Sequence, residues 1–204
     1  MTLEPRIYLA SKSPRRRELL TQIGVRFDLL MFRAPPREDA ATDETPLPGE
    51  LPEVYARRVA TAKAMHGAEL VTARKLLARP VLAADTTLDV DGEIVGKPND
   101  DEDAVAILSR LSGRSHEVIT AVAISHAGVS QCVASVSEVR FRKLELAEIR
   151  RYVASGEPHD KAGAYGLQGR AAVFVESVRG SPSGIVGLPL CETALLLRSF
   201  GYPI

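Results

Sequence analysis

Two long apolar runs in the second half of the chain constrain its fold more than any other feature. They are HEVITAVAIS, residues 116–125, and QCVASVSEVRFRKL, residues 131–144, and the turn-like residues 126–128, His-Ala-Gly, lie between them. Apolar or alternating runs that a short glycine-containing turn separates are typical of a β-hairpin. The sequence therefore predicts a long antiparallel hairpin, and a fold that is built around a sheet.

Helix-like and strand-like segments are mixed along the rest of the chain. Further strands are predicted for residues 6–10, 25–32, 80–90, 92–96 and 172–178. Helices are predicted for 14–23, 53–77 with an interruption at Gly67 left open, 100–111 capped by Asn99 or Asp100, 146–155 and 188–200. Residues 33–52 hold five prolines without an apolar period, which predicts a long loop. No repeat or linker appears, so we expect one mixed α/β domain over residues 1–204 with a central cleft.

The composition excludes some partners and locations. The 26 lysines and arginines equal the 26 aspartates and glutamates, so no overall basic field attracts nucleic acid. No apolar run approaches the ~18 residues of a membrane helix, and the apolar part of MTLEPRIYLA is too short for a signal peptide. We therefore expect a cytoplasmic protein without a membrane partner.

The two cysteines, Cys132 and Cys191, lie far apart in apolar stretches, which predicts two buried, unreactive thiols.

Three arginines follow a helix-start signal in SKSPRRRE, residues 11–18. Ser13 can cap the free amides of the first turn, and Pro14 fits that turn because it has no N–H. The helix dipole disfavours cations there by roughly a few tenths of a kcal/mol each. A phosphate would offset this cost, because first-turn amides and guanidinium groups both donate to its oxygens. We predict a phosphate role for at least two of the arginines; an ordinary solvated basic turn is the alternative.

An acidic residue interrupts the apolar strand in LAADTTLDVDGEIVGKP, residues 82–98. Asp85 follows the apolar residues 81–84, where a carboxylate is rare unless a cation, a metal or a hydrogen-bond donor pairs with it. The predicted turn at Asp91-Gly92 returns the chain, so that Lys97 lies beside Asp85. Asp85 is therefore a candidate site residue, and a capping or turn role is the alternative.

Small residues surround four polar ones in SGEPHDKAGAYGLQG, residues 155–169. The backbone of such a stretch can come close to a ligand while Asp160, Lys161, Tyr165 and Gln168 contact it. The amide of Gln168 can both donate and accept, which suits the edge of a base.

Other residues give weaker signals. Lys63 lies on a predicted helix and Glu44 in a polar loop, where each would ordinarily be a solvated surface residue. The histidines show no metal-ligand spacing, and neither a Ser-His-Asp pattern nor a GxxxxGK[ST] phosphate loop is present.

Taken together and in this order, the segments resemble the Maf family of nucleoside triphosphate pyrophosphatases. SKSPRRREL is similar to the family motif SxSPRRxxLL, and AADTTLDVDGEIVGKP to ADTxVxxDGxIxxKP. LSGRSHEVITAVAI, YVASGEPHDKAGAYGLQG and IVGLPLCET are similar to later segments, so the resemblance covers residues 7–197. It implies a curved mixed α/β sheet flanked by helices, with two lobes around a deep cleft.

The resemblance also implies hydrolysis of a nucleoside triphosphate to the monophosphate and pyrophosphate, with a divalent cation (Mg²⁺ or Mn²⁺) as cofactor. Asp85 matches the proposed catalytic carboxylate. The expected phosphate-binding residues are Ser11, Arg16, Lys63, Lys97 and, from the glycine-rich segment, Lys161. Glu44 matches an acidic metal-site position, so Asp85 and Glu44 are the expected metal ligands, with Glu38 as the alternative loop acid.

Three positions bear on the substrate. Arg15, Thr86 and Gln168 match the branch of the family that hydrolyses dTTP and UTP, and CTP or modified pyrimidine nucleotides extend this expectation. The branch that acts on 7-methyl-GTP has a Trp after Ser-Pro and a Glu in place of the Gln. This chain has no Trp, so it lacks an aromatic platform for a cationic purine. The implied role is removal of unwanted nucleotides, with a link to cell-division arrest as a further expectation.

Alternative functions stay open at this point. A nucleotide- or nucleic-acid-binding regulator would use the same cleft without turnover, although the neutral net charge disfavours nucleic acid and a buried carboxylate favours an enzyme. A 7-methyl-GTP pyrophosphatase, a kinase or a phosphatase would share the same binding of phosphate. Apolar strand positions in residues 133–139 are compatible with a homodimer.

Overall fold

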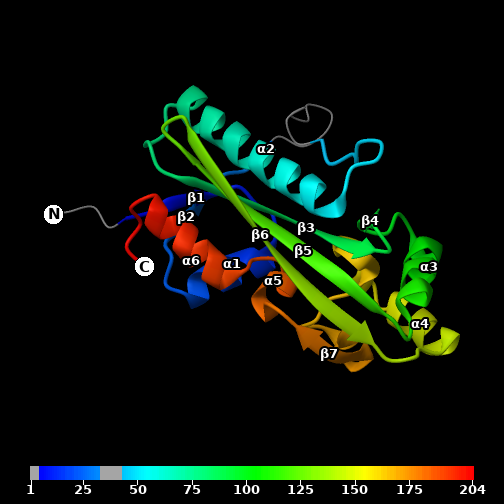
Figure 1. The fold of residues 1–204 in the computed structure, drawn as a ribbon. Helices are drawn as coiled ribbons and strands as arrows, with labels where there is room; N and C mark the ends of the chain where they lie inside the picture. The colour runs from blue at the N-terminus through cyan, green and yellow to red at the C-terminus, as the bar shows by residue number, and fades with distance from the viewer. Residues whose placement is uncertain (1–4, 33–42) are drawn as a thin grey trace.

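One mixed sheet forms the centre of the computed structural model, which describes residues 5–32 and 43–204 (Figure 1). Within these residues the sheet has seven strands, in the order β2-β1-β3-β5-β6-β7, with β4 paired to β3. The strands are β1 (Ile7–Leu9), β2 (Phe27–Leu29), β3 (Val81–Val90), β4 (Glu93–Val95), β5 (Ser115–His126), β6 (Val129–Phe141) and β7 (Val175–Arg179). β1 runs parallel to β2 and β3, and the other pairs are antiparallel.

Helices cover both faces of this sheet. They are α1 (Pro14–Gln22), α2 (Pro52–Ala73), α3 (Asp101–Leu111), α4 (Leu146–Val153), α5 (Pro182–Val186) and α6 (Leu190–Ser199), with short 3-10 turns η2 (Glu157–Asp160), η3 (Ala162–Ala164) and η4 (Arg170–Phe174). Figure 1 shows the long helix α2 lying along one face of the sheet, with α1 and α6 on the other face of the sheet. Alternation along β3 explains this arrangement, because Val81 and Ala83 pack toward α2 whereas Leu82 and Ala84 pack toward α1 and α6.

A separate core lies at the other end of the long strands. There Leu88 and Val118 of the sheet pack with Leu108 of α3 and Ile149 of α4. Helices α3 and α4 thus lie at one end of the sheet and α1, α2 and α6 at the other, which agrees with the two lobes that the resemblance implied.

The predicted long hairpin is confirmed. β5 and β6 pair from Ser115 with Arg140 to His126 with Val129. The turn consists of Ala127 and Gly128, whose φ angles of 49° and 80° are both positive, as in the two-residue turns that match strand twist.

Several element boundaries differ from the predictions. Gly67 does not interrupt α2. It allows the helix to lie close to β3, since a Cβ atom there would lie 2.6 Å from Cγ1 of Val81. α2 ends at Ala73 rather than at residue 77. Residues 170–174 form η4, so β7 begins at Val175 rather than at residue 172.

Two further expectations are corrected. The short helix α5, which no pattern in the sequence predicted, lies between β7 and α6. The expectation of two buried thiols is wrong: Cys191 is exposed in the first turn of α6, and Cys132 is half-buried. None of the helices in the described part of the chain combines the length and the apolar character that crossing a bilayer requires.

Candidate active site

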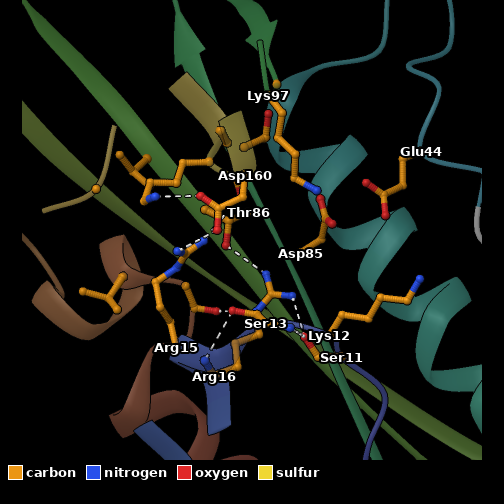
Figure 2. A pocket seen from close by; sticks show the side chains of 18 of the residues that line it. Ser11, Lys12, Ser13, Arg15, Arg16, Glu44, Asp85, Thr86, Lys97 and Asp160 are labelled. Atoms are coloured by element: carbon orange, nitrogen blue, oxygen red, sulfur yellow. Dashed lines mark hydrogen bonds and ion pairs between the residues drawn. The ribbon is translucent and has the colours of Figure 1, made fainter. Parts of the chain in front are cut away.

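A cleft with a volume of about 1220 Å³ is lined by residues of α1, α2, β3 and α5 and by residues 160–162 and 165–168. The predicted site residues that line it are Ser11, Arg15, Arg16, Glu44, Lys63, Asp85, Thr86, Lys97, Lys161 and Gln168. Glu38, the alternative loop acid, lies outside the described residues. All ten described candidates therefore meet at one cleft, part of which is drawn in Figure 2.

The cleft lies where one edge of β3 is open. β1 pairs with β3 as far as Leu82, and β4 pairs with the same edge only from Leu88 onward. Among the strands of the described residues, none covers this edge at residues 84–87. Successive strand residues point to opposite faces, so Asp85 reaches α2 and Thr86 reaches α1. The open edge lets both side chains line the same cleft.

The start of α1 brings two arginines to the cleft. The Oγ of Ser13 accepts a hydrogen bond from the backbone N–H of Arg16 at 3.5 Å, and Pro14 occupies the first turn, as predicted. Arg15 and Arg16 line the cleft, whereas Arg17 is absent from its lining.

Three oxygen atoms hold the guanidinium group of Arg16. Nε donates to the carbonyl of Gly187 at 2.8 Å, Nη1 to Oγ of Ser11 at 3.3 Å, and Nη2 to Oγ1 of Thr86 at 3.2 Å. Burial lowers the pKa of Arg16, and the nearby carboxylates, Asp85 foremost, oppose that shift. Arg16 therefore remains a cation with a fixed orientation.

The ammonium group of Lys63 joins two carboxylates. Its Nζ lies 2.8 Å from Oδ1 of Asp85 and 2.6 Å from Oε1 of Glu44. The side chains of Lys63 and Asp85 are only 12% and 9% exposed, so water screens their attraction weakly. Burial alone would raise the pKa of Glu44, but Lys63, Lys97 and Arg16 outweigh it and hold that pKa below its ordinary value. The carboxylate of Glu44 is thus ionised at neutral pH.

Lys97 and Tyr55 complete this cluster. Lys97 follows β4, and Figure 2 shows its side chain pointing toward Asp85. Tyr55, on the first turn of α2, donates its hydroxyl proton to the backbone carbonyl of Glu44 at 2.8 Å. Burial, reinforced by the charges of Asp85 and Glu44, raises the pKa of Tyr55. The phenol therefore stays protonated and ties the Glu44 loop to α2.

A second charged group lies across the cleft from this cluster. Nη1 of Arg15 lies 3.1 Å from Oδ2 of Asp160, and Nζ of Lys161 lies 2.6 Å from Oδ1 of the same carboxylate. The contact joins α1 to η2 across 145 positions of the sequence. Lys161 lines the cleft as predicted, but its ammonium group contacts Asp160 and the carbonyl of Glu157.

Gln168 lies in the loop between η3 and η4, where its side chain is exposed. The carboxylate of Glu157 braces this loop by accepting hydrogen bonds from the hydroxyl of Tyr152 and from the backbone N–H of Arg170. The next residue, Gly169, lies against it: a Cβ atom there would lie 2.0 Å from Oε1 of Glu157. Glycine at position 169 therefore allows the close approach that places Gln168 at the cleft.

The donor set of the cleft fits a divalent cation in part. Glu44 and Asp85 direct carboxylate oxygens at one ammonium group, which shows that the space between them is favourable for positive charge. Hard cations such as Mg²⁺ prefer oxygen ligands and commonly take one or two carboxylates together with substrate phosphates. Within residues 5–32 and 43–204, no group of three or more His, Cys, Asp or Glu side chains forms a complete metal cage.

Three residues of the site were not predicted from the sequence: Lys12, Tyr55 and Thr120. Thr120 reaches the site through a hydrogen bond to Thr86. The sequence predicts that Asp160 contacts a ligand, whereas in the structure this residue pairs with Arg15, a contact that depends on the fold. Only the SKSP pattern itself, which contains Lys12, could have indicated one of the missed residues.

Comparisons with known proteins show which family this sequence belongs to. The sequence model described as Maf-like protein matches residues 6–200. A dTTP/UTP pyrophosphatase of Dechloromonas aromatica is 60% identical over 197 residues, which cover 97% of this chain and 98% of the relative. Proteins of the same name from Aromatoleum aromaticum and Chromobacterium violaceum are 60% and 50% identical, and the matches cover at least 99% of this chain and 98% of each relative.

Proposed function

The chain belongs to the Maf-like protein family, and from that membership we propose that it hydrolyses dTTP and UTP to the monophosphates and pyrophosphate. The observation that carries the proposal is the meeting of Arg16, Lys63 and Lys97 with the carboxylates of Asp85 and Glu44 in one cleft. Cations suit a triphosphate, whereas a protein that only binds anions gains nothing from a buried carboxylate.

The cations position and neutralise the phosphate chain. A nucleoside triphosphate carries about four negative charges, and its hydrolysis depends mainly on positioning and on stabilisation of charge. Arg16 is already oriented by three acceptors, so its free N–H groups can meet phosphate oxygens without reorganisation. Lys97 approaches from the opposite side of the cleft (Figure 2). Ser11 adds a hydroxyl group beside Arg16.

Asp85 is the residue that we assign to the attacking water. Lys63 contacts its Oδ1, which leaves the other carboxylate oxygen to orient the water, to accept its proton, or both. Attack of that water on the α-phosphorus would release pyrophosphate as the leaving group. The ammonium group of Lys63 lies 2.8 Å from this carboxylate and holds it in place in the cleft.

A divalent cation, Mg²⁺ or Mn²⁺, belongs to this proposal, with Asp85 and Glu44 as its protein ligands. When bound, such a cation neutralises phosphate charge and lowers the pKa of water. Tyr55 holds the Glu44 loop at the cleft, and the cationic neighbours of Glu44 keep its pKa low, so this carboxylate is charged before any ligand arrives.

Gln168, with Arg15 and Thr86, is our assignment for selection of pyrimidines. The amide of Gln168 can donate to one carbonyl of thymine or uracil and accept from N3–H. Guanine presents the same carbonyl and ring N–H on this edge, so discrimination against purines would depend on the larger size of their bicyclic ring. CTP and modified pyrimidine nucleotides are further expected substrates.

We place the enzyme in the cytoplasm. A homodimer stays a prediction, and it rests on exposed apolar residues of β6 such as Val136.

Product identification tests the proposed function directly. The purified protein is incubated with dTTP, UTP, CTP, GTP and 7-methyl-GTP, with and without EDTA, and the products are separated by chromatography. We expect dTMP and UMP together with pyrophosphate, and loss of activity with EDTA. Binding without turnover would indicate a regulator, diphosphate plus phosphate would indicate a phosphatase, and a preference for 7-methyl-GTP would refute the pyrimidine assignment.

A further inference from the structure

A chain of hydroxyl groups runs from Arg16 into the interior of the protein. Nη2 of Arg16 lies 3.2 Å from Oγ1 of Thr86, which lies 2.9 Å from Oγ1 of Thr120. Thr120 in turn lies 2.8 Å from the backbone carbonyl of Gly184 in α5. Thr120 is completely buried and pairs directly with Thr86 across strands β3 and β5.

The backbone carbonyl at the inner end of this row of hydroxyl groups fixes the direction of each hydrogen bond in it. The carbonyl of Gly184 can only accept, so the hydroxyl proton of Thr120 points to it. Thr120 must therefore accept from Thr86, whose own proton points inward. The oxygen of Thr86 is then free to accept from Arg16, which can only donate. A hydroxyl group so committed has no proton left for a substrate.

The chain determines which part of Arg16 is available to phosphate. A guanidinium group has five N–H donors, and Gly187, Ser11 and Thr86 each take one of them. Two N–H groups remain, one on each terminal nitrogen, and they can contact phosphoryl oxygens together. If Thr86 turned its proton toward Arg16, it would oppose the guanidinium group instead of holding it.

We propose that Thr120 is a positioning residue for the reaction: its hydroxyl group orients Thr86 so that Thr86 can hold Arg16 for the phosphates. This inference rests on the proposed function. Thr120 is completely buried in β5, where a hydroxyl group is costly unless it forms a hydrogen bond.

A role in folding alone does not explain the hydroxyl group of Thr120. The carbonyl of Gly184 already accepts from the backbone N–H of Gly187 at 2.9 Å, so α5 does not need Thr120 to satisfy that carbonyl. Valine has nearly the same shape and would fill the same space. The hydroxyl group is needed at the other end of the chain, where Arg16 lies.

The test replaces the hydroxyl group and keeps the shape. We expect Thr120→Val to lower kcat/KM for dTTP about tenfold, since a buried hydrogen-bonded chain is broken, and Thr120→Ser to keep most of the activity. Thr193→Val is the matched control: Thr193 is completely buried in α6, and within the described residues its Oγ1 has no hydrogen-bond partner. This control should leave kcat/KM unchanged.

A double-mutant cycle distinguishes positioning from a general loss of structure. If Thr120 acts through Arg16, Thr120→Val should cost less than about twofold in an Arg16→Lys background, which has no guanidinium group to orient. A full tenfold loss in that background would overturn the proposal, as would wild-type activity of Thr120→Val. If the valine variant does not fold, Thr120→Cys, which keeps a weaker donor, should show an intermediate loss, and wild-type activity of it would count against the proposal.

A measurement without substrate separates this proposal from the proposed function. The Nε–H group of Arg16 donates a hydrogen bond to the backbone carbonyl of Gly187, and the hydrogen exchange of this group can be followed by NMR in the free protein. We expect exchange about tenfold faster in Thr120→Val than in the wild type or in Thr120→Ser. Unchanged exchange would refute the role of Thr120 even if dTTP is the substrate. Faster exchange in a protein that does not hydrolyse dTTP would support the positioning and refute the proposed function alone.

Discussion

Lys63 and Asp85, which lie on α2 and β3, form an ion pair of 2.8 Å inside the cleft, with side chains only 12% and 9% exposed. The same ammonium group reaches Glu44 at 2.6 Å. Removal of one member of a buried pair leaves the other charge uncompensated, but here each carboxylate shares its cation with a second one. Substitutions of single carboxylates should therefore affect activity more than folding.

Asp85→Asn should lower kcat at least about a hundredfold, because an amide neither accepts a proton from water nor carries charge toward a cation. Release of pyrophosphate from dTTP gives the rate. Asp91→Asn is the matched control, since Asp91 pairs with Arg114 on the surface outside the cleft. If Asp85→Asn turned over dTTP at the wild-type rate, the assignment of this carboxylate would be wrong.

Glu44→Gln should raise the Mg²⁺ concentration for half-maximal activity by roughly tenfold, because one charged ligand is lost from the pair. Titration of the rate with Mg²⁺ at saturating dTTP measures this. Glu53→Gln provides the comparison, because Glu53 pairs with Arg57 and does not line the cleft. An unchanged Mg²⁺ requirement would contradict the assignment of Glu44 and leave Glu38, the other loop acid, as the candidate ligand.

Asp160→Asn should lower the KM for dTTP by up to a few-fold. Asp160 holds Arg15 and Lys161, and its side chain is 61% exposed, so an ion pair of this kind contributes only about 0.2 to 1 kcal/mol. The substitution frees two cations for the substrate. Asp101→Asn, which alters the neighbouring contact with His159, should not change KM. A tenfold rise in KM for Asp160→Asn would mean that the pair persists in the complex.

Gln168→Glu should lower kcat/KM for dTTP and UTP by roughly tenfold or more, because a carboxylate cannot donate to a base carbonyl. The substrate panel described above gives the ratios. Gln131→Glu is the comparison: Gln131 accepts a hydrogen bond from Ser199 on another face of the protein. Equal losses for pyrimidine and purine substrates would argue against a role in base selection.

The stability of the protein should depend on the titration of His116. This side chain is buried beside Phe141 and Tyr165, and burial lowers its pKa from 6.5 to about 4. Between these values the unfolded chain binds a proton that the native protein does not, so stability is full above pH 6.5 and falls as the pH decreases toward 4. The free energy of unfolding should lose about 3 kcal/mol over this range.

Denaturant unfolding of the wild type and of His116→Gln at several pH values measures this contribution. Glutamine stays neutral and can accept from the hydroxyl of Tyr165, so the difference between the two proteins isolates His116. The advantage of the wild type should shrink as the pH falls below 6.5. A difference that is constant from pH 7 to pH 4 contradicts the prediction.

Local sequence patterns predicted most of the helices and strands and several residues of the site. The alternation in residues 116–144 gave the hairpin, and Ser13-Pro14 gave the start of α1, because capping and alternation act over a few residues. The 3-10 turns and α5 escaped prediction, since short segments have little periodicity and depend on tertiary packing. The exposure of Cys191 also depends on which face of α6 the rest of the chain covers.

The sequence by itself determined which chemical groups this protein can bring to a substrate: a basic helix start, a carboxylate in an apolar strand and an amide among glycines. Only the tertiary structure decided that they meet, because β1 and β4 leave an edge of β3 open at residues 84–87. That gap brings Asp85 and Thr86, from opposite faces of one strand, into the same cleft. The partners Lys63 and Arg16 come from helices on the two sides of the sheet, a relation that no local pattern encodes.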